Sequence, residues 1–570
     1  MKRCILVATV ALLIVGALAP TPASAVESFT FYGSGWGHRI GMSQYGALGL
    51  AQKGLARNAI LQSFYTNVTI GQAPSPPSQI RVGLFNTVPS IRLKALDTGV
   101  ALRLGSTAAA AVATIPAGQT WTIEILSAAY RIKREDGTYV GTSHGNATTK
   151  LYATYAGVGG GVYLPGTFHT YRRGFMEFNL HQSCVTCAWN LRLIIVVSAE
   201  GYMMGLGEVP SSWPAQALQA QAVAGRSYAF AKVRDSGQSR SPCNCGLYAS
   251  TLDQVYVGSD KELGTLGENW VAAVEETTGL VALHSGSTIT AFYSSSSGGL
   301  TESNADVWGG APLPYLGMRC DAGDYVSSNP NRTWTTTKDG VAIGNGLHAT
   351  TGTDIGNALS FSNMVRAPGG HVKTLTVNGT KTSVTVSGST FRLASGITSA
   401  RFWINTNRHI TGAIRTTYDG KGCAPGLPTS ASVPVTDGRY MNFAIGRIYS
   451  NYLTGGAYWL EGPVFDKYVA LGAHNGLMGL PKSGTHTMVG TAGRKANLTG
   501  GRIYWITAAG AHESHDPVLA KYLTQGEAAG TLGFPTTDVV SAGPDKVQQT
   551  FQNGVTTCTV STGVCTSKLN

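Results

Sequence analysis

The sequence is poor in charged side chains and, beyond its first residues, in long apolar runs. Charged residues make up 13% of the 570 residues, roughly half of the share that is usual in globular proteins. After residue 25 no stretch approaches about 18 consecutive apolar residues, so no membrane span is expected in the mature chain. Basic runs and RNA-binding motifs are missing too, which excludes nucleic acid from the predicted partners.

The first residues contain a short apolar run between two basic residues and a small-residue cleavage pattern. Lys2 and Arg3 precede the run and Ala23-Ser24-Ala25 follows it, which predicts a removable signal peptide over residues 1–25. The expected location is therefore secreted, in the cell wall or outside the cell. Loss of Lys2 and Arg3 lowers the net charge from +12 to +10, and this modest positive field favours anionic polymers as partners.

Eight cysteines remain once Cys4 leaves with the signal peptide. An even number in an exported chain favours disulfides, although their connectivity does not follow from one sequence. Cys320 with Cys423, and Cys558 with Cys565, are natural pairs. The alternative is a zinc site that uses His181 and four thiols, namely Cys184, Cys187, Cys243 and Cys245. The prediction is no cofactor and no metal, with this zinc site as the alternative.

The last third of the chain contains an internal repeat. Residues 462–481 align without gaps on 516–535, and the tetrapeptide GRIY occurs at 446 and again at 501. A spacing of about 55 residues indicates an array of small units, each with a short helix, a Gly-rich turn and an aromatic strand. The segment 424–438, rich in Pro, Ser and Gly, is predicted to be a linker that precedes this array.

The repeat resembles the LGFP repeat family of actinobacterial envelope proteins. The letters LGFP occur at 532–535, and a degenerate form, MGLP, at 478–481. The resemblance implies that residues 439–570 form a small repeat domain that binds a polymer of the cell envelope.

Upstream of the array, short apolar runs alternate with turn residues. This pattern predicts a mainly β domain of the α+β class with a few helices. The clearest helix signal covers residues 211–233, where Ser211 or Ser212 can cap the first turn and Pro214 suits it. Glu208 lies just before this segment, so it is interpreted either as a charge at a helix N-terminus or as a catalytic acid.

Ordered stretches across residues 26–423 resemble the SpoIID/LytB-type family, which is named for a sporulation peptidoglycan lytic transglycosylase. They include AEGYMMGLGEVPSSWPAQALQAQAVAGRSYA at 199–229, AFYSSSSGGLTESNADVWGG at 291–310, SGSTFR at 387–392 and GWGHRIGMSQYGA at 35–47. The last motif usually closes the family domain. Its early position implies a circular permutation, in which residues 26–72 fold back beside the Glu208 region of the main body, 79–423.

The resemblance implies that Glu208 is the catalytic residue. A carboxylic acid in a partly desolvated groove can protonate the departing oxygen of a glycosidic bond. Hydrolytic glycosidases normally need a second carboxylate, and no obvious one occurs in these segments. A lytic transglycosylase does not need it, because the C6 hydroxyl of muramic acid attacks C1 and one glutamate acts first as acid, then as base. Apolar cover from Val209, Trp213 or Trp36 must outweigh the helix dipole, which stabilises the anion.

The same segments supply the predicted substrate-binding residues, which are His38, Ser43, Gln44, Tyr45, Trp213, Arg226, Tyr293, Ser297, Thr301 and Glu302. For the residues of the N-terminal motif the alternative role is turn and cap formation. Arg226 is predicted to orient a carboxylate or a substrate lactyl group, or else to be a solvated helix charge. Glu302 could instead hold its Ser/Gly-rich loop through backbone hydrogen bonds.

The predicted function is a secreted lytic transglycosylase that cleaves the bond between N-acetylmuramic acid and N-acetylglucosamine in glycan strands. The resemblance further implies a preference for strands without stem peptides. The alternative is a non-catalytic wall-binding protein or amidase activator, which would not need Glu208. A zinc amidase would need His and Glu ligands that the sequence does not group. Some family members use Cys and His before the Q-V-Y segment for zinc, but here no His lies between Cys243 and Gln254.

Overall fold

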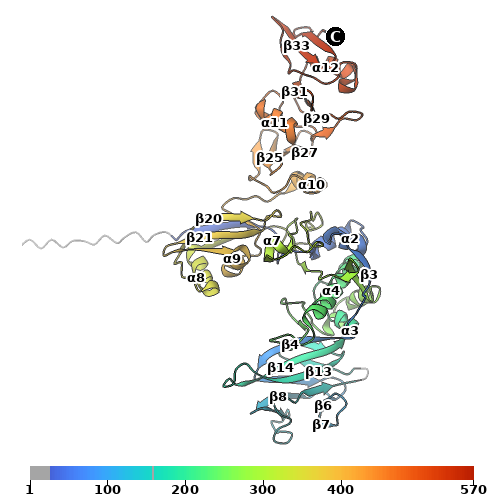
Figure 1. Cartoon of the computed structure of the whole chain (residues 1–570), viewed down its shortest axis with the longest axis vertical. Helices are drawn as coiled ribbons and strands as arrows, with labels where there is room; N and C mark the ends of the chain where they lie inside the picture. The colour runs from blue at the N-terminus through green and yellow to red at the C-terminus, as the bar shows by residue number, and fades with distance from the viewer. Residues whose placement is uncertain (1–25, 157–158) are drawn as a thin grey trace, which may run out of the picture.

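The computed structural model describes residues 26–156 and 159–570, so the predicted signal peptide lies outside the described residues. Figure 1 shows a body of β-sheet at one end, a centre rich in helices with a smaller unit beside it, and repeats that extend to the C-terminus. No helix in this described part is long and apolar enough to cross a membrane. The class is α+β with more strand than helix, which confirms the prediction.

The sheet body (residues 79–198) consists of two mainly antiparallel sheets packed around one core. The larger sheet has the order β15(Leu247–Tyr248), β4(Gln79–Val88), β14(Trp189–Ser198), β13(Phe175–Gln182), β10(Leu151–Thr154), β6(Val100–Leu104), β7(Ala111–Ile115). The smaller has the order β12(His169–Tyr171), β11(Val162–Leu164), β5(Ser90–Ala95), β8(Thr120–Leu126), β9(Ala129–Lys133). Strand β5 alternates exposed and buried residues along its length, as a strand with one solvated face must.

The centre of the molecule is built on the long helix α4(Ala215–Ser236), which is buried along most of its length. Around it lie α1(Gln44–Gln52), α2(Arg57–Phe64), α3(Ala199–Met204), α5(Asp260–Leu263), α6(Gly267–Glu275), α7(Asn304–Trp308), β16(Leu280–His284) and β17(Ser287–Thr288). Small side chains such as Ala220 and Ala224 let several neighbours approach the helix closely. The predicted caps are wrong, because the helix begins one residue after Pro214 and no side chain caps it.

The N-terminal segment is woven into the rest of the chain rather than forming a unit of its own. β1(Ser28–Gly33) pairs with β19(Trp334–Asp339) and β23(Phe402–Ile404). β2(Met42–Ser43) pairs in parallel with β18(Tyr293–Ser294), and β3(Thr69–Gln72) pairs with β16. Ile40, Met42 and Ile60 share a core with Ala220 and Ala224 of α4. This packing brings the GHRIGMSQ motif beside the helix that follows Glu208.

A smaller unit, here called the side unit (residues 334–404), flanks the centre (Figure 1). It contains α8(Gly340–Thr351), β20(Ala358–Arg366), β21(Val372–Gly379), β22(Ser383–Ser387) and α9(Gly388–Ser395), with Phe31, Phe391 and Phe402 in its core. The Ser387 hydroxyl caps α9 by accepting a hydrogen bond from Thr390 N at 3.0 Å. Gly388 allows close packing, because a Cβ there would lie 1.9 Å from the Val372 carbonyl oxygen.

The repeats follow the side unit as three similar sheets of four antiparallel strands. The first repeat consists of β24(Val433–Val435), β25(Gly438–Asn442), β26(Arg447–Asn451) and β27(Gly456–Leu460), followed by α11(Gly462–Ala470). The second consists of β28(His486–Thr487), β29(Arg494–Asn497), β30(Arg502–Ile506) and β31(Gly510–Ser514), followed by α12(Val518–Thr524). The third consists of β32(Val540–Ser541), β33(Lys546–Phe551), β34(Gly554–Thr559) and β35(Cys565–Leu569). In the first two, a helix tyrosine donates a hydrogen bond to the glycine of the Gly-x-Pro turn, Tyr468 to Gly479 O and Tyr522 to Gly533 O, each at 2.7 Å. This bond explains why these residue types recur.

The structure differs from the predicted linker over residues 424–438. This segment contains β24 and the start of β25, and Leu427 packs against a core that joins α10(Gly412–Gly420) to the first repeat. In that core Tyr418 stacks on Phe443 with ring centroids 5.4 Å apart. Pro434 is tolerated because β24 is an edge strand, and proline cannot donate to a central ladder. The composition of residues 424–438 suggested a flexible linker, whereas the structure has an edge strand in this segment.

The shared core predicts that the first repeat is fixed to α10. Phe443→Ala should destabilise this junction by about 3 to 5 kcal/mol, because it removes a buried aromatic ring from a packed core. Ile445→Ala is the matched control: Ile445 lies in the same turn and is 50% exposed, so its effect should stay within about 0.5 kcal/mol. Thermal unfolding and limited proteolysis of residues 424–438 measure both. Equal effects of the two substitutions would contradict the shared core.

Candidate active site

A cleft of about 640 Å³ lies between the centre and the side unit. Its lining residues come from distant parts of the chain and include Trp36, His38, Gln44, Glu208, Asp253, Tyr293, Trp308, His371 and Arg392. The N-terminal motif, the Glu208 region and the side unit thus meet only in the folded chain. A concave site with a few convergent polar groups is the usual place for ligand binding.

Glu208 lies in the turn between α3 and α4 and points its carboxylate at the backbone of a neighbouring loop. Its Oε1 accepts a hydrogen bond from Val255 N at 2.6 Å. Gln44 Nε2 lies 3.3 Å from the Glu208 carbonyl oxygen and 3.5 Å from Oε2. The structure therefore contradicts the interpretation of Glu208 as a helix cap, because its carboxylate is bound to Val255 and α4 has no side-chain cap.

Burial raises the pKa of Glu208, and this effect outweighs the hydrogen bonds from Val255, Tyr293 and Gln44, which stabilise the anion. The apolar residues that were predicted to cover Glu208 differ in their burial. Val209 is buried as expected, whereas Trp36 is 52% exposed at the cleft. The buried phenol of Tyr202 lies near enough for the charge of Glu208 to help raise its pKa. The carboxyl group can thus hold a proton above the usual pH range of a glutamate.

A chain of hydrogen bonds fixes the hydroxyl group of Tyr293. The side-chain amide of Gln254 donates to Gly225 O at 3.1 Å and to the Tyr293 hydroxyl oxygen at 2.8 Å. The Tyr202 hydroxyl donates to Gln254 Oε1 at 2.9 Å. Because the Tyr293 oxygen accepts from Gln254, its own hydrogen is available to Glu208, with which it forms a hydrogen bond. Tyr293 therefore orients the acid as well as lining the cleft.

His38 and Gln44 line the cleft, but Tyr45 and Trp213 do not. The Tyr45 ring packs on Trp213 at a centroid distance of 5.4 Å, and the Tyr45 amide donates to Ser295 O at 3.1 Å. Burial lowers the pKa of His38 to about 4, so at neutral pH its ring is uncharged. Its Nδ1 accepts a hydrogen bond from Ile40 N at 3.0 Å, so the ring lines the cleft without a positive charge.

Two predicted substrate-binding serines are buried beneath the cleft. Ser43 donates to Asp324 Oδ1 at 2.8 Å and caps α1 by accepting from Gly46 N. Ser297 donates to Asp321 Oδ2 at 2.7 Å. Both hydroxyl groups are thus used inside the protein, and for Ser43 the cap that the sequence offered as an alternative is what forms.

Arg226, Thr301 and Glu302 are also interior residues. Arg226 is fully buried and its Nη2 lies 2.7 Å from Glu200 Oε2, so it orients a carboxylate of the protein itself and is neither a cleft residue nor a solvated helix charge. The Thr301 hydroxyl bonds to the backbone at Gly317 and Arg319. Glu302 accepts from Gly369 N and His371 N. It therefore holds a loop through backbone hydrogen bonds, the alternative role, although this loop belongs to the side unit.

Asp253, Trp308, His371 and Arg392 are among the cleft residues that the sequence prediction missed. Trp308 and Arg392 occur in stretches that match the family, but nothing in a single sequence shows that these stretches face Glu208. Burial lowers the pKa of His371 to about 3, so this ring is also neutral. Asp253 forms ion pairs with Arg240 and Lys232 and accepts a hydrogen bond from the Tyr228 hydroxyl at 3.0 Å. Its charge is thus already neutralised.

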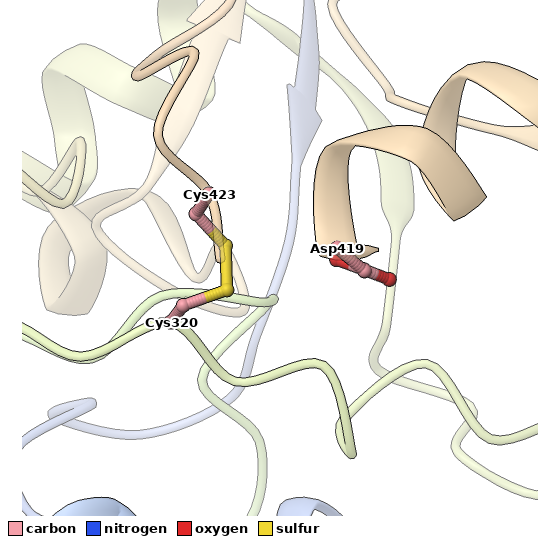
Figure 2. Close-up of side chains that lie close together, drawn as sticks. All are labelled: Cys320, Asp419 and Cys423. Atoms are coloured by element: carbon pink, nitrogen blue, oxygen red, sulfur yellow. A yellow bond between two sulfur atoms is a disulfide. The ribbon is translucent and has the colours of Figure 1, made fainter. Parts of the chain in front are cut away.

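The cysteines of the alternative zinc site form two disulfides, Cys184–Cys187 and Cys243–Cys245. The sulfur atoms are therefore not thiolates, and this donor set does not fit a zinc ion. Figure 2 shows a further group in which Cys320 and Cys423 are joined by a disulfide near Asp419. Asp419 forms an ion pair with Arg415 at 2.7 Å. In both groups the cysteines are used in disulfides, so neither offers a thiolate.

Comparison with known proteins identifies a recognised domain that includes Glu208 and Asp253. Residues 189–284 match the SpoIID family model, described as a stage II sporulation protein, and residues 426–476 and 478–530 match the LGFP repeat model. An amidase enhancer of Bacillus subtilis (strain 168) is 38% identical over 130 residues, 23% of this chain and 16% of that protein. An uncharacterized protein of Brachyspira hyodysenteriae (strain ATCC 49526 / WA1) is 32% identical over 165 residues, 28% of this chain and 42% of its own. The chain thus spans less than half the length of either relative, and both predicted resemblances are confirmed.

The raised pKa of Glu208 predicts a pH-dependent effect on stability. The folded state holds this proton more tightly than the unfolded state, in which the pKa is near 4.5, so stability falls as pH rises through the raised pKa. Glu208→Gln should therefore melt at a higher temperature than the wild type at pH 8 and at a similar temperature at pH 4. The control is Glu268→Gln, since Glu268 is exposed. A lower melting temperature for Glu208→Gln at pH 8 would contradict the burial of the charge.

Proposed function

We propose, for a chain that carries a SpoIID domain and LGFP repeats, that it is a secreted peptidoglycan lytic transglycosylase with Glu208 as general acid and base. The observation that carries the proposal is a half-buried carboxyl group in the cleft, with a raised pKa, that is oriented by Val255, Gln44 and Tyr293. The bond cleaved joins N-acetylmuramic acid to N-acetylglucosamine. The expected product is a strand with a 1,6-anhydro-muramoyl end.

The reaction needs one proton donor that later becomes a proton acceptor. Protonated Glu208 gives its proton to the glycosidic oxygen, which leaves with the N-acetylglucosamine unit as C1 of the muramoyl sugar becomes electron-poor. The C6 hydroxyl of the same sugar attacks C1, and the Glu208 carboxylate takes the hydroxyl proton. Val255 N binds Oε1, so Oε2 is the oxygen available to carry the transferred proton. No water enters the bond balance.

The interactions of Asp253, the second carboxylate in the cleft, favour a nucleophile from the substrate itself over an attacking water. A hydrolase that uses two carboxylates needs the second one to activate water or to attack the sugar. Asp253 is tied to Arg240, Lys232 and Tyr228, so its basicity is used inside the protein. With Asp253 occupied, the C6 hydroxyl of the substrate is the nucleophile that fits this site best.

The LGFP repeats are proposed to hold the enzyme at a polymer of the cell envelope. The repeats extend away from the centre and the side unit (Figure 1), between which the cleft lies, so both regions can contact wall material at once. Attachment raises the effective concentration of the cleft near glycan strands even when each repeat binds weakly. An extracellular or cell-wall location follows from these two domain types.

A second candidate function is an activator of wall amidases without catalysis of its own. It is favoured by the name of the Bacillus subtilis relative, an amidase enhancer. The matched segment covers 16% of that protein, so the name describes a much longer chain. The two candidates differ in whether Glu208 is needed.

Glu208→Gln should lower the release of anhydro-muramoyl ends by at least about 100-fold, the usual contribution of a general acid and base. Purified full-length protein is incubated with peptide-free glycan strands and the products are identified by mass. Glu268→Gln, the exposed control, should keep wild-type activity. The activator function would be favoured if the wild type bound strands without forming any product, and if the wild type and Glu208→Gln both stimulated an added amidase.

The pH dependence of activity should follow the protonated form of Glu208. Because burial raises its pKa, the acid form persists above the usual range of a glutamate. Above that pKa, kcat/KM should fall about tenfold for each pH unit, since the proton donor is lost. His38 and His371 stay neutral above about pH 4 and about pH 3, so neither accounts for such a fall. A profile that rises with pH across this range would contradict the role of Glu208 as acid.

A further inference from the structure

Arg392 is a cation of the cleft that forms no ion pair with any residue in the described part of the chain. It lies on α9 of the side unit, is half-buried, and lines the cleft together with Glu208. Within the described ranges, 26–156 and 159–570, no carboxylate lies within ion-pair distance of its guanidinium group and no side chain accepts a hydrogen bond from it. Two buried arginines, Arg226 and Arg415, are by contrast paired with Glu200 and Asp419.

The other ionisable groups of the cleft do not neutralise Arg392. Its charge contributes to the lowered pKa values of His38 and His371, which places the guanidinium group near both rings. Both rings are neutral at pH 7 and supply no negative charge. Asp253 is already bound by Arg240 and Lys232. The pKa of Glu208 is set by burial and by hydrogen bonds from Val255, Tyr293 and Gln44, and Arg392 is not among these causes. The positive charge is therefore available to a ligand.

The position of Arg392 is fixed by the start of its helix. Ser387 caps α9, and Gly388 packs directly against the Val372 carbonyl. Ser389 also lines the cleft, and residues three apart share one face of a helix. The arginine thus projects from a rigid element, which lowers the entropy that a ligand must remove on binding.

We infer that Arg392 is the receptor for a carboxylate carried by the glycan, an inference that rests on the proposed function. On a peptidoglycan strand the sugar-borne carboxylate is the lactyl group of muramic acid, which is a free anion only where no stem peptide is attached. A guanidinium group binds a carboxylate through two parallel hydrogen bonds. An amide at the same position would leave the half-buried charge unpaired. Arg392, rather than the buried Arg226, thereby selects strands without stem peptides.

The test measures binding by full-length Glu208→Gln protein, in which turnover is suppressed, with and without Arg392→Gln. The probes are peptide-free glycan strands, the same strands with their carboxyl groups converted to amides, and strands that keep their stem peptides. Arg392→Gln should weaken binding of peptide-free strands by about tenfold or more, the value of one charge-assisted pair, and should leave binding of amidated strands unchanged. Arg392→Lys should retain part of the preference. Because all proteins carry the same repeats, the differences report on the cleft.

The control is Lys381→Gln, which removes a positive charge from the same side unit at a side chain that is 64% exposed; it should not change binding. Equal weakening toward peptide-free and amidated strands, or none, would overturn the inference, and so would Arg392-dependent binding that is strongest for peptide-bearing strands. Melting temperatures show whether each variant folds. A wild type that yields no anhydro-muramoyl ends would overturn the proposed function alone and leave the binding result standing.

Discussion

The whole site depends on a carboxyl group held where water cannot fully solvate its charge. Burial raises the pKa of Glu208 while one short hydrogen bond from Val255 N fixes its direction. The packing that creates this environment is that of α4, whose small side chains let the N-terminal segment approach from one side and α6 from another. Gln44 reaches Glu208 only because α1 lies on α4. A change in that packing would move the acid and its surroundings together.

Beneath the cleft, buried polar groups hold the loops in place. Asp321 and Asp324 bind the hydroxyl groups of Ser43, Ser296 and Ser297, and their burial and mutual repulsion raise the pKa of Asp321. A buried network is stable only when its members are satisfied, so it also specifies one arrangement of the loops. Serines that resemble ligand-binding residues in the sequence are here the frame on which the cleft is built.

Local patterns predicted much of the architecture, and their failures have clear causes. The repeated tyrosine and Gly-x-Pro turn mark one recurring hydrogen bond, so the repeat was visible in the letters. The 424–438 segment was misjudged because proline and serine suit an edge strand as well as a linker. The sequence left the role of Arg226 open, because a helix arginine gives no sign of which carboxylate it binds. Its partner, Glu200, is 26 residues away in the sequence.

The sequence by itself determined the domain types, the repeat and the single glutamate, because each depends on residues close together in the chain or on an ordered resemblance. Only the tertiary structure decided which polar side chains face the ligand, because the cleft joins residues as distant as Trp36 and Arg392. The pKa of Glu208 belongs to the same category, since it depends on burial by elements from across the chain. So does the free charge of Arg392: whether a cation is paired is settled by its neighbours in space.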